Sequence, residues 1–215
     1  CSQISGEIDG RVWEVSFELI DDVPMHPVST EAELFDALAD DSIRSIVING
    51  ELTLTQPLTV TKPVYVIYDS SIVIPEGEAV TVDGSIFVVN GQLTCDAIDV
   101  ANGGMLEVIG EWTSHGDGAA LNLTGGSWAY SRMCAMSVSE LTLSENSMAV
   151  YASVDAALLR DIELSGGSFL VLRGETLASD SLNAELSDST LIQLCSAELG
   201  GSSSVVLSRT SLYSQ

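Results

Sequence analysis

Acid–base chemistry requires a side chain that titrates near neutral pH, and the segment Ser114-His115-Gly116-Asp117-Gly118 places one beside a carboxylate. Because histidine gains and loses its proton in this range, His115 and Asp117 are candidates for a general acid and base. Glycosidase chemistry needs two carboxylates at a defined separation, which a chain with 31 acidic residues can supply by chance. A polar loop at a corner of the fold would have the same composition, so both interpretations stay open.

Carbohydrate binding is the second chemistry that the residue types suggest, through Trp128, Tyr130 and Tyr151. Each lies in a segment that is apolar at consecutive positions. Only one face of a strand can point into a core, so the other face of these segments must be exposed. Exposed apolar strips mark contact surfaces. We expect this one to be either a glycan platform or a surface covered by a partner protein or by another segment.

The chain carries a large excess of negative charge, with seven Lys and Arg residues against 31 Asp and Glu residues and a formal net charge of −24. Phosphate binding needs clustered cationic side chains, so the composition argues against a nucleic-acid partner and against an anionic membrane surface. Ca²⁺ would suit the carboxylates, but no loop of EF-hand or Gly-Gly-x-Gly-x-Asp type occurs. We therefore predict no metal site and no cofactor. No run of about 18 apolar residues is present, so no transmembrane helix is expected.

The four cysteines form no Cys-x-x-Cys pair, which argues against a zinc site or a redox motif. Cys95, Cys134 and Cys195 are predicted to be free, buried thiols. Cys1, followed by Ser2 and Gln3, resembles the start of a mature bacterial lipoprotein, in which the first cysteine is lipidated. This resemblance implies an extracellular or cell-surface location and a membrane attachment through lipid alone. An arbitrary chain boundary would give the same sequence.

A five-residue motif recurs through the second half of the chain: Leu, then Ser or Thr, two variable residues, and a closing Ser or Thr. The closing residues stand at positions 127, 147, 168, 190 and 211, at intervals of 20, 21, 22 and 21 residues. A degenerate copy at 100–104 ends in Gly. A near-constant period of about 20 to 25 residues is typical of a solenoid, in which each repeat is one coil stacked on the next.

Each coil should bury the Leu of its motif together with the apolar residue two positions earlier, because that spacing puts both on one face of a strand. The Ser or Thr three residues before each closing residue should lie at a corner, where stacked hydroxyls bond each other or satisfy backbone groups, and we predict a structural role for them. A second strand follows the closing hydroxyl. We align its first positions as Trp128, Met148, Phe169, Leu191 and Leu212.

Residues 1–28 precede the repeats and are predicted to form an N-terminal segment with one strand, near 11–19, that could act as a tether. Pro24 and Pro27 interrupt the pattern and make His26 a linker residue. Thr30 and Glu33 then form a capping box, which predicts a helix over about 31–40. Short strands separated by turn residues begin near residue 43, so 29–215 is predicted to be one domain.

These features resemble the pectate-lyase-like right-handed parallel β-helix superfamily over roughly residues 29–215. The resemblance rests on the capped helix at 31–40, the first coil around Ile46-Val47-Ile48-Asn49-Gly50 and the rungs of about 21 residues that follow. It implies an all-β, single-stranded right-handed parallel β-helix solenoid whose open N-terminal end is plugged by the helix, through Phe35 and Leu38. No equivalent cap is visible at the other end, which we expect to be continued by a further segment or covered by a partner.

The same resemblance raises carbohydrate-active enzymes as an alternative function. Lyases of the pectate type need Ca²⁺-binding carboxylates and a basic residue, and here only Arg132, Arg160 and Arg173 fall on central coils, without a recognisable carboxylate cluster. The paired-Asp, Gly-His-Gly and Arg-x-Lys motifs of polygalacturonase-type hydrolases are absent. We therefore predict a non-catalytic bacterial surface or secreted scaffold, adhesin-like, with glycans as candidate ligands. A polysaccharide lyase or glycoside hydrolase and a self-associating structural protein are the alternatives.

Overall fold

The computed structural model describes residues 2–8, 11–17, 24–131, 138–151, 159–179, 182–199 and 202–214 of the 215-residue chain. Side chains are described over residues 24–131, 138–150, 159–172, 182–191 and 202–211. Every structural statement below refers to these ranges.

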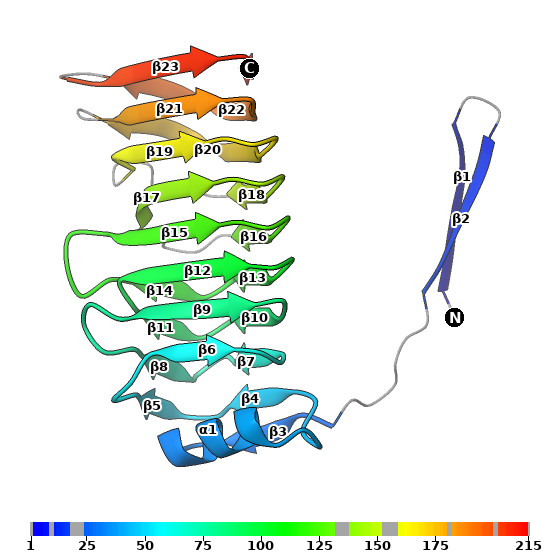
Figure 1. The fold of residues 1–215 in the computed structure, drawn as a ribbon, viewed down its shortest axis with the longest axis vertical. Coiled ribbons are helices and arrows are strands. Elements are labelled where there is room, and N and C mark those ends of the chain that lie inside the picture. Colours follow the sequence, from blue (N-terminus) through cyan, green and yellow to red (C-terminus); the bar gives the residue numbers. More distant parts are fainter. Residues whose placement is uncertain are drawn as a thin grey trace.

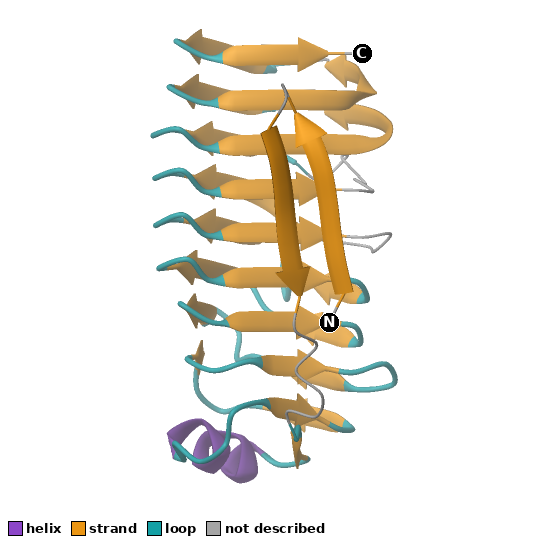
Figure 2. Cartoon of the chain, turned by 90° about the vertical axis from the view of Figure 1, so that its right-hand side faces the viewer, coloured by secondary structure: helices purple, strands orange, loops and turns teal. Residues whose placement is uncertain are grey.

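The body of the protein is a right-handed parallel β-solenoid of about seven turns with about 21 residues per turn, as the repeat predicted (Figure 1). Between Ile46 and Thr113 each coil passes in order through three parallel sheets, which we call sheets 1, 2 and 3; the strands described after Thr113 belong to sheets 1 and 3. Strands of successive coils lie one above the other along the axis (Figure 2). Parallel stacking of this kind leaves one face of each sheet for the interior and one for solvent.

Sheet 1 has ten strands. In spatial order they are β3 (His26–Val28), β4 (Ile46–Ile48), β7 (Val64–Val66), β10 (Ile86–Val89), β13 (Met105–Val108), β16 (Trp128–Ser131), β18 (Met148–Tyr151), β20 (Phe169–Ser179), β22 (Thr190–Leu199) and β24 (Ser211–Ser214).

Sheet 2 has four strands and sheet 3 has eight. Those of sheet 2 are β5 (Glu51–Thr53), β8 (Ser71–Val73), β11 (Gln92–Thr94) and β14 (Glu111–Thr113). Those of sheet 3 are β6 (Leu58–Val60), β9 (Ala79–Asp83), β12 (Ala97–Ala101), β15 (Ala119–Leu123), β17 (Val138–Leu143), β19 (Asp161–Leu164), β21 (Asn183–Ser187) and β23 (Ser204–Ser208).

The interior is a continuous apolar core that runs along the axis. The motif leucines are buried as predicted in four of the five copies; these are Leu123, Leu143, Leu164 and Leu186. The fifth, Leu207, is 46% exposed, because no described coil lies above β23. The largest fully buried side chains are Trp112 and Phe87. Burial of successive aliphatic layers is what stabilises a solenoid whose coils contact only their neighbours.

The single described helix, α1 (Glu31–Ala39), covers the N-terminal end of the core (Figure 1). The predicted capping box is confirmed: the Glu33 amide donates to Thr30 Oγ1 at 3.3 Å, and the Thr30 amide donates to Glu33 Oε2 at 3.1 Å. Leu34 and Ala37 are the buried residues of the helix, while Phe35 and Leu38, the predicted plug, pack partly buried against the core. The predicted plug residues thus contact the core together with Leu34 and Ala37.

The segment before the helix differs from the prediction of one strand and a linker. β1 (Ser2–Ile8) and β2 (Arg11–Phe17) form an antiparallel two-stranded sheet of their own. β3 pairs with β4, so the solenoid begins at His26 and not at residue 29, and the linker interpretation of His26 is wrong. Pro27 has no N–H to donate, which closes this edge of sheet 1 to a further strand.

The turns between sheet 3 and sheet 1 correct the predicted register of the last two coils. Earlier turns contain two residues with left-handed backbone, such as Glu145 (φ 54°) and Asn146 (φ 63°), whereas the later turns contain one, Asp188 (φ 46°) or Arg209 (φ 51°). The shorter turn moves the next strand by one residue. The residues that share a register are therefore Ala129, Ala149, Leu170, Leu191 and Leu212.

The closing hydroxyl of the first three motif copies lies inside the coil. Register puts Ser127, Ser147, Ser168 and Ser189 in one column, and all four are buried; in the fourth copy Ser189 takes this place, one residue before the closing Thr190. The Ser127 hydroxyl donates to the Thr124 carbonyl at 2.5 Å. The other three hydroxyls have no hydrogen-bond partner within the described residues. The serine column is therefore internal, and most of its hydroxyls are buried without a partner in the described part of the chain.

Candidate functional site

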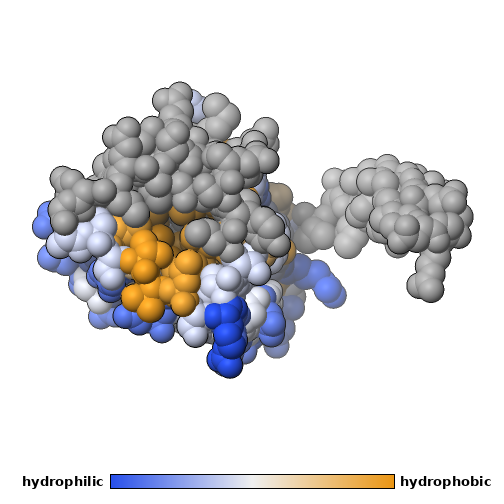
Figure 3. Space-filling view, turned by 90° about the horizontal axis from the view of Figure 1, so that it is seen from above, coloured by the Kyte–Doolittle hydropathy of each residue, from blue (hydrophilic) through white to orange (hydrophobic). Residues whose placement is uncertain are grey.

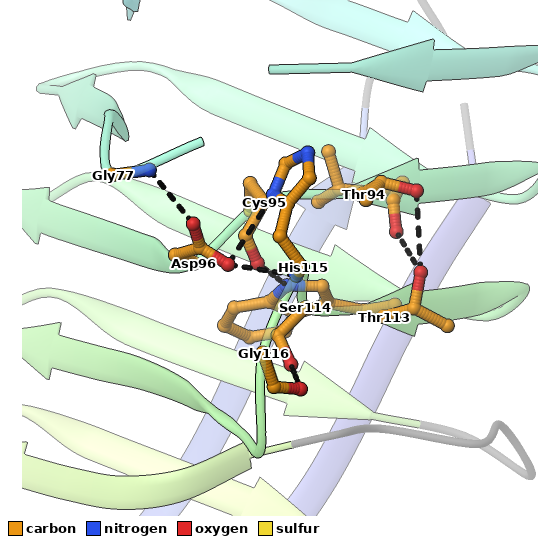
Figure 4. Close-up of polar contacts among 10 residues, drawn as sticks. Gly77, Thr94, Cys95, Asp96, Thr113, Ser114, His115 and Gly116 are labelled. Carbon is orange, nitrogen blue, oxygen red and sulfur yellow. Dashed lines mark hydrogen bonds and ion pairs between the residues drawn. The ribbon is translucent and has the colours of Figure 1, made fainter. Parts of the chain in front are cut away.

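The predicted catalytic pair is not brought together as the sequence suggested, because His115 pairs with Asp96 and not with Asp117. Asp96 lies one coil earlier, at the corner between sheets 2 and 3 (Figure 4). His115 Nδ1 is 3.3 Å from Asp96 Oδ1, and the His115 amide donates to the same oxygen at 2.8 Å. The stacking of coils thus supplies a partner that is 19 residues away in the sequence.

The Asp96 carboxylate braces this corner. Its other oxygen, Oδ2, accepts the Gly77 amide at 2.8 Å, so Asp96 ties together three successive coils. Partial burial alone would raise the pKa of Asp96, but hydrogen bonds from the Gly77 and His115 amides and from the His115 ring outweigh it, and the pKa lies below its usual range. A carboxylate held ionised by backbone donors on both oxygens suits a structural role better than proton transfer.

The neighbours of this corner are also engaged in structural contacts. Ser114 Oγ donates to the Gly116 carbonyl at 2.8 Å, and Thr94 Oγ1 and Thr113 Oγ1 lie 3.2 Å apart (Figure 4). Asp117 is exposed, and its carbonyl accepts from the Arg160 guanidinium at 3.3 Å. Arg132 lies outside the described residues, as does the side chain of Arg173.

Sheet 1 carries the most unusual surface of the protein, a strip of apolar side chains on its outer face. We call it the apolar strip and define it by two columns in register. The first is Ile86, Met105, Trp128, Met148 and Phe169, and the second is Val47, Tyr65, Val88, Tyr130, Val150 and Val171, with Glu107 between Val88 and Tyr130. All are half-buried or exposed, with Trp128 at 36% and Met148 at 38% exposure.

The outer faces of the other two sheets are polar at the corresponding positions. Sheet 3 presents Thr59, Thr81, Asp99, Asn122, Thr142, Glu163 and Glu185 in one column. Sheet 2 presents Glu51, Ser71, Gln92 and Glu111. The outer faces therefore differ in composition: that of sheet 1 is apolar, and those of sheets 2 and 3 are polar at these positions. Exposed apolar patches mark contact surfaces, and the outer face of sheet 1 is the one that has this composition.

The predicted aromatic platform is only partly assembled. Trp128 and Tyr130 lie two residues apart on β16 and belong to the apolar strip. Tyr151 is in register with Ser131 and Leu172 and not with Trp128 or Tyr130, and its side chain is outside the described residues. The strip residues that the sequence analysis missed include Met105, Val88 and Tyr65, which precede the regular repeats. For Val88 and Tyr65, the apolar composition of the segments 64–68 and 86–89 could have predicted an apolar outer face.

Carboxylates gather on two other surfaces. Glu140, Asp161, Glu163 and Glu185 line a hollow of about 400 Å³ on sheet 3. Glu51, Asp69 and Glu111 line a second, of about 370 Å³, at the corner between sheets 1 and 2. Within the described part of the chain, no group of three or more His, Cys, Asp or Glu residues is arranged to hold a metal ion. No described helix is long and apolar enough to cross a membrane.

The C-terminal end of the described solenoid shows a second apolar patch. Val205, Val206 and Leu207 of β23 are 48%, 55% and 46% exposed. Figure 3 looks onto this end and shows hydrophobic side chains gathered there. Arg209 in the following turn pairs with Asp188 of the coil below, at 2.6 Å.

The cysteines are partly placed by the structure. Cys95 is free and buried, as predicted, and burial raises the pKa of its thiol to about 12. Its carbonyl accepts the Trp112 indole N–H at 3.0 Å. Cys1, Cys134 and the side chain of Cys195 lie outside the described residues, so the lipidation of Cys1 stays a prediction.

Comparison with known proteins assigns the chain to no family. No protein-family model, no curated protein and no solved structure in the comparison matches the chain. The resemblance to the pectate-lyase-like superfamily therefore stays a prediction, while the parallel β-solenoid itself is observed.

Proposed function

We propose that this protein is a non-catalytic scaffold, carried on a bacterial surface or secreted, that binds another protein through the apolar strip of sheet 1. The observation that carries the proposal is the contrast between that strip and the polar outer faces of sheets 2 and 3. The strip is largely aliphatic, with Met105, Met148 and several valines, and offers few hydrogen-bond donors. An apolar protein surface is a better match for it than a sugar, whose hydroxyls need polar partners.

The rest of the surface supports a role in which the rod stays soluble while one face makes contact. A formal charge of −24 disfavours non-specific association of copies and of other acidic molecules. Glu107 is the single carboxylate among the described positions of the strip, so this face carries less charge than the rest of the molecule. A partner that binds at the strip therefore meets less electrostatic repulsion from the acidic side chains than it would elsewhere on the surface.

Photo-crosslinking tests the protein-binding proposal in the cells that make the protein. p-Benzoylphenylalanine replaces Met148 in the strip, and in a matched control it replaces Thr142, which lies half-buried on the outer face of sheet 3. We expect discrete crosslinked partners from position 148 that are missing from position 142. The same products from both positions, or none from position 148, would count against the proposal. Cell fractionation of the same samples tests the surface location.

A glycan ligand is the second candidate, favoured by the pair Trp128 and Tyr130 on β16. Their side chains lie about 7 Å apart along the strand, which allows both rings to contact one oligosaccharide. Glycan-array binding that is lost in the Trp128→Ala/Tyr130→Ala double variant, and kept in Thr142→Ala, would assign the strip to a glycan.

The enzyme alternative has its own assay. Release of reducing sugar from acidic polysaccharides, measured for the wild-type protein and for His115→Ala, would establish catalysis if the wild-type protein is active and the variant is not. The two backbone N–H groups that occupy the Asp96 carboxylate lead us to expect no release.

A further inference from the structure

The apolar strip has the length and width of one helix. Both of its columns are present from β10 to β20, because the first column runs from Ile86 to Phe169. The distance from β10 to β20 is four strand spacings, or about 19 Å. The two columns lie two residues apart along each strand, which is about 7 Å. A helix of about 13 residues is about 19 Å long and about 10 Å across, so it covers both columns over this length.

The outer face of sheet 1 offers a partner side chains and not backbone. The N–H and C=O groups of β10 to β20 point along the sheet, toward the neighbouring strands with which they pair. A segment that lies on this face must therefore satisfy its own backbone groups. A helix does so internally, whereas a single extended segment would leave polar backbone against apolar side chains. Helices are also the usual cover of parallel sheets.

Carboxylates border the two-column part of the strip. Asp83 lies three residues before Ile86, and Glu145 lies three residues before Met148, both in turns from sheet 3 into sheet 1. Asp83 Oδ1 accepts from the Asn102 side-chain amide at 2.6 Å, and Glu145 Oε2 accepts from the Gly125 amide at 3.1 Å. Since these donors are uncharged, both carboxylates keep their negative charge.

The charges within and beyond this part of the strip agree with the border. Glu107 adds a carboxylate inside the second column, and no described strip position is Lys or Arg. Arg44 and Lys62 precede β4 and β7, so they lie beside the single-column end of the strip. Lys62 also donates to the Ala37 and Asp40 carbonyls at the end of α1. The surface from β10 to β20 is thus apolar along its middle and acidic at its edge, which complements a basic amphipathic segment.

The largest side chain of the two-column part lies at its centre. Trp128 is on β16, the middle strand of the five from β10 to β20, and is 36% exposed. Met105 and Met148 lie beside it in the same column. A central aromatic residue flanked by adaptable methionines is the arrangement in which a few residues carry most of the binding energy.

We infer that the apolar strip binds a basic amphipathic helix of a partner protein. The apolar side of that helix lies on the two columns between β10 and β20, and its Lys or Arg residues face the bordering carboxylates. This inference rests on the proposed function and names the kind of partner that the strip takes.

Binding of a designed peptide to the full chain tests the inference. The probe is a fluorescein-labelled peptide of about 14 residues, made of Leu and Lys with Leu at helical spacing. One control peptide has the same composition with Leu at alternate positions, and another keeps the helical spacing but replaces Lys by Glu. Fluorescence anisotropy measures affinity, and circular dichroism measures helix content, which should rise on binding because so short a peptide is marginally helical in water.

Two protein variants locate the contact. Met148→Lys adds a positive charge within the strip, and Thr142→Lys adds the same charge beside the carboxylate hollow of sheet 3. Both lower the general attraction for a cationic peptide equally, so a difference between them reports the site. We expect Met148→Lys to weaken binding of the helical Leu/Lys probe at least about 10-fold and Thr142→Lys at most about 2-fold. Trp128→Ala should weaken it at least about 10-fold without any change of charge.

Several results would overturn the inference. A larger loss in Thr142→Lys than in Met148→Lys would place the peptide in the carboxylate hollow. Equal binding of the alternating peptide would show that the strip takes extended structure, and equal binding of the Glu peptide would show that charge does not select the partner. A dissociation constant above about 1 mM for the helical Leu/Lys probe would exclude the helix as the partner's contact element.

The proposed function and this inference fail separately. If photo-crosslinking at position 148 captures a partner and the crosslinked peptide is a strand or an acidic segment, the proposed function stands and the helix does not. If the helical probe binds at the strip while position 148 captures no partner in cells, the strip has the inferred specificity and the scaffold proposal does not stand.

Discussion

Replacing Ser147 by alanine is expected to stabilise the protein, although the change removes a polar group from a repeated turn. Ser147 is fully buried, and its hydroxyl has no partner within the described residues. Ser127 occupies the same register one coil earlier, and its hydroxyl donates to the Thr124 carbonyl at 2.5 Å. The two positions therefore differ in hydrogen bonding while sharing burial and backbone geometry.

The expected magnitudes have opposite signs. A buried polar group without a partner costs about 1–3 kcal/mol, and alanine removes that cost while keeping the Cβ atom in place. The gain is reduced by the dispersion contacts of the lost oxygen, so we expect Ser147→Ala to raise the free energy of unfolding by about 1 kcal/mol. Ser127→Ala removes a bonded hydroxyl and should lower it by about 0.5–1.5 kcal/mol.

Denaturant unfolding of the two variants and the wild type measures both effects, with the midpoint and the slope fitted together. A shift in midpoint at constant slope reports stability alone. In thermal unfolding, 1 kcal/mol corresponds to about 2–4 °C for a domain of this size. If Ser147→Ala destabilises as much as Ser127→Ala, the Ser147 hydroxyl has a partner and the reasoning is refuted. Ser168→Ala repeats the test one coil later.

Three further predictions concern the corners and the core. Gly110→Ala should lower the free energy of unfolding by at least about 2 kcal/mol, because the added Cβ would lie 2.0 Å from the Gly91 carbonyl oxygen. Gly116→Ala is the control, since no atom lies within 4 Å of the added Cβ, and the denaturant midpoints of the two variants should differ accordingly. Ionised Asp96 contributes stability that is present above the ordinary Asp pKa of 3.8 and is lost as the pH falls through its lower folded-state pKa. The protection factor of the His115 amide against hydrogen exchange should therefore fall in that acidic range and, in Asp96→Asn, already at neutral pH; an unchanged His115 protection factor in the variant would exclude the brace. The Cys95 thiol, with its pKa raised to about 12, should resist alkylation at mildly alkaline pH until the protein unfolds, and peptide mass spectrometry would detect early labelling if this is wrong.

Local sequence signals predicted the elements that depend on local contacts. Thr30 and Glu33 are three residues apart, so their capping box depends only on neighbouring residues, and α1 begins directly after Thr30 as predicted. The motif leucines share a period set by one turn of the solenoid, so the parallel coil and the burial of Leu123, Leu143, Leu164 and Leu186 also followed from the pattern. The hairpin at residues 2–17 was missed in part, although Asp9-Gly10 between two alternating runs is a typical two-residue hairpin connection.

The candidate sites were predicted less well because they are made by contacts between coils. His115 and Asp96 are 19 residues apart and meet only when two corners stack. Trp128 and Tyr130 share the outer face of β16, because a strand alternates sides at every residue, whereas Tyr151 is in register with Ser131 and Leu172. One left-handed residue fewer in the turns at Asp188 and Arg209 puts Leu191 and Leu212 in register with Leu170, and not with Phe169 as the sequence alignment had them.

The sequence by itself determined the period, the capped helix and the aliphatic interior, because each is a regular pattern that hydrophobic burial enforces on any chain of this composition. Only the tertiary structure decided which strand faces solvent, which carboxylate meets His115 and where the hydroxyls of the motif lie. Those outcomes depend on turn length and stacking register, because a turn shorter by one residue changes which residues of the next strand face the interior.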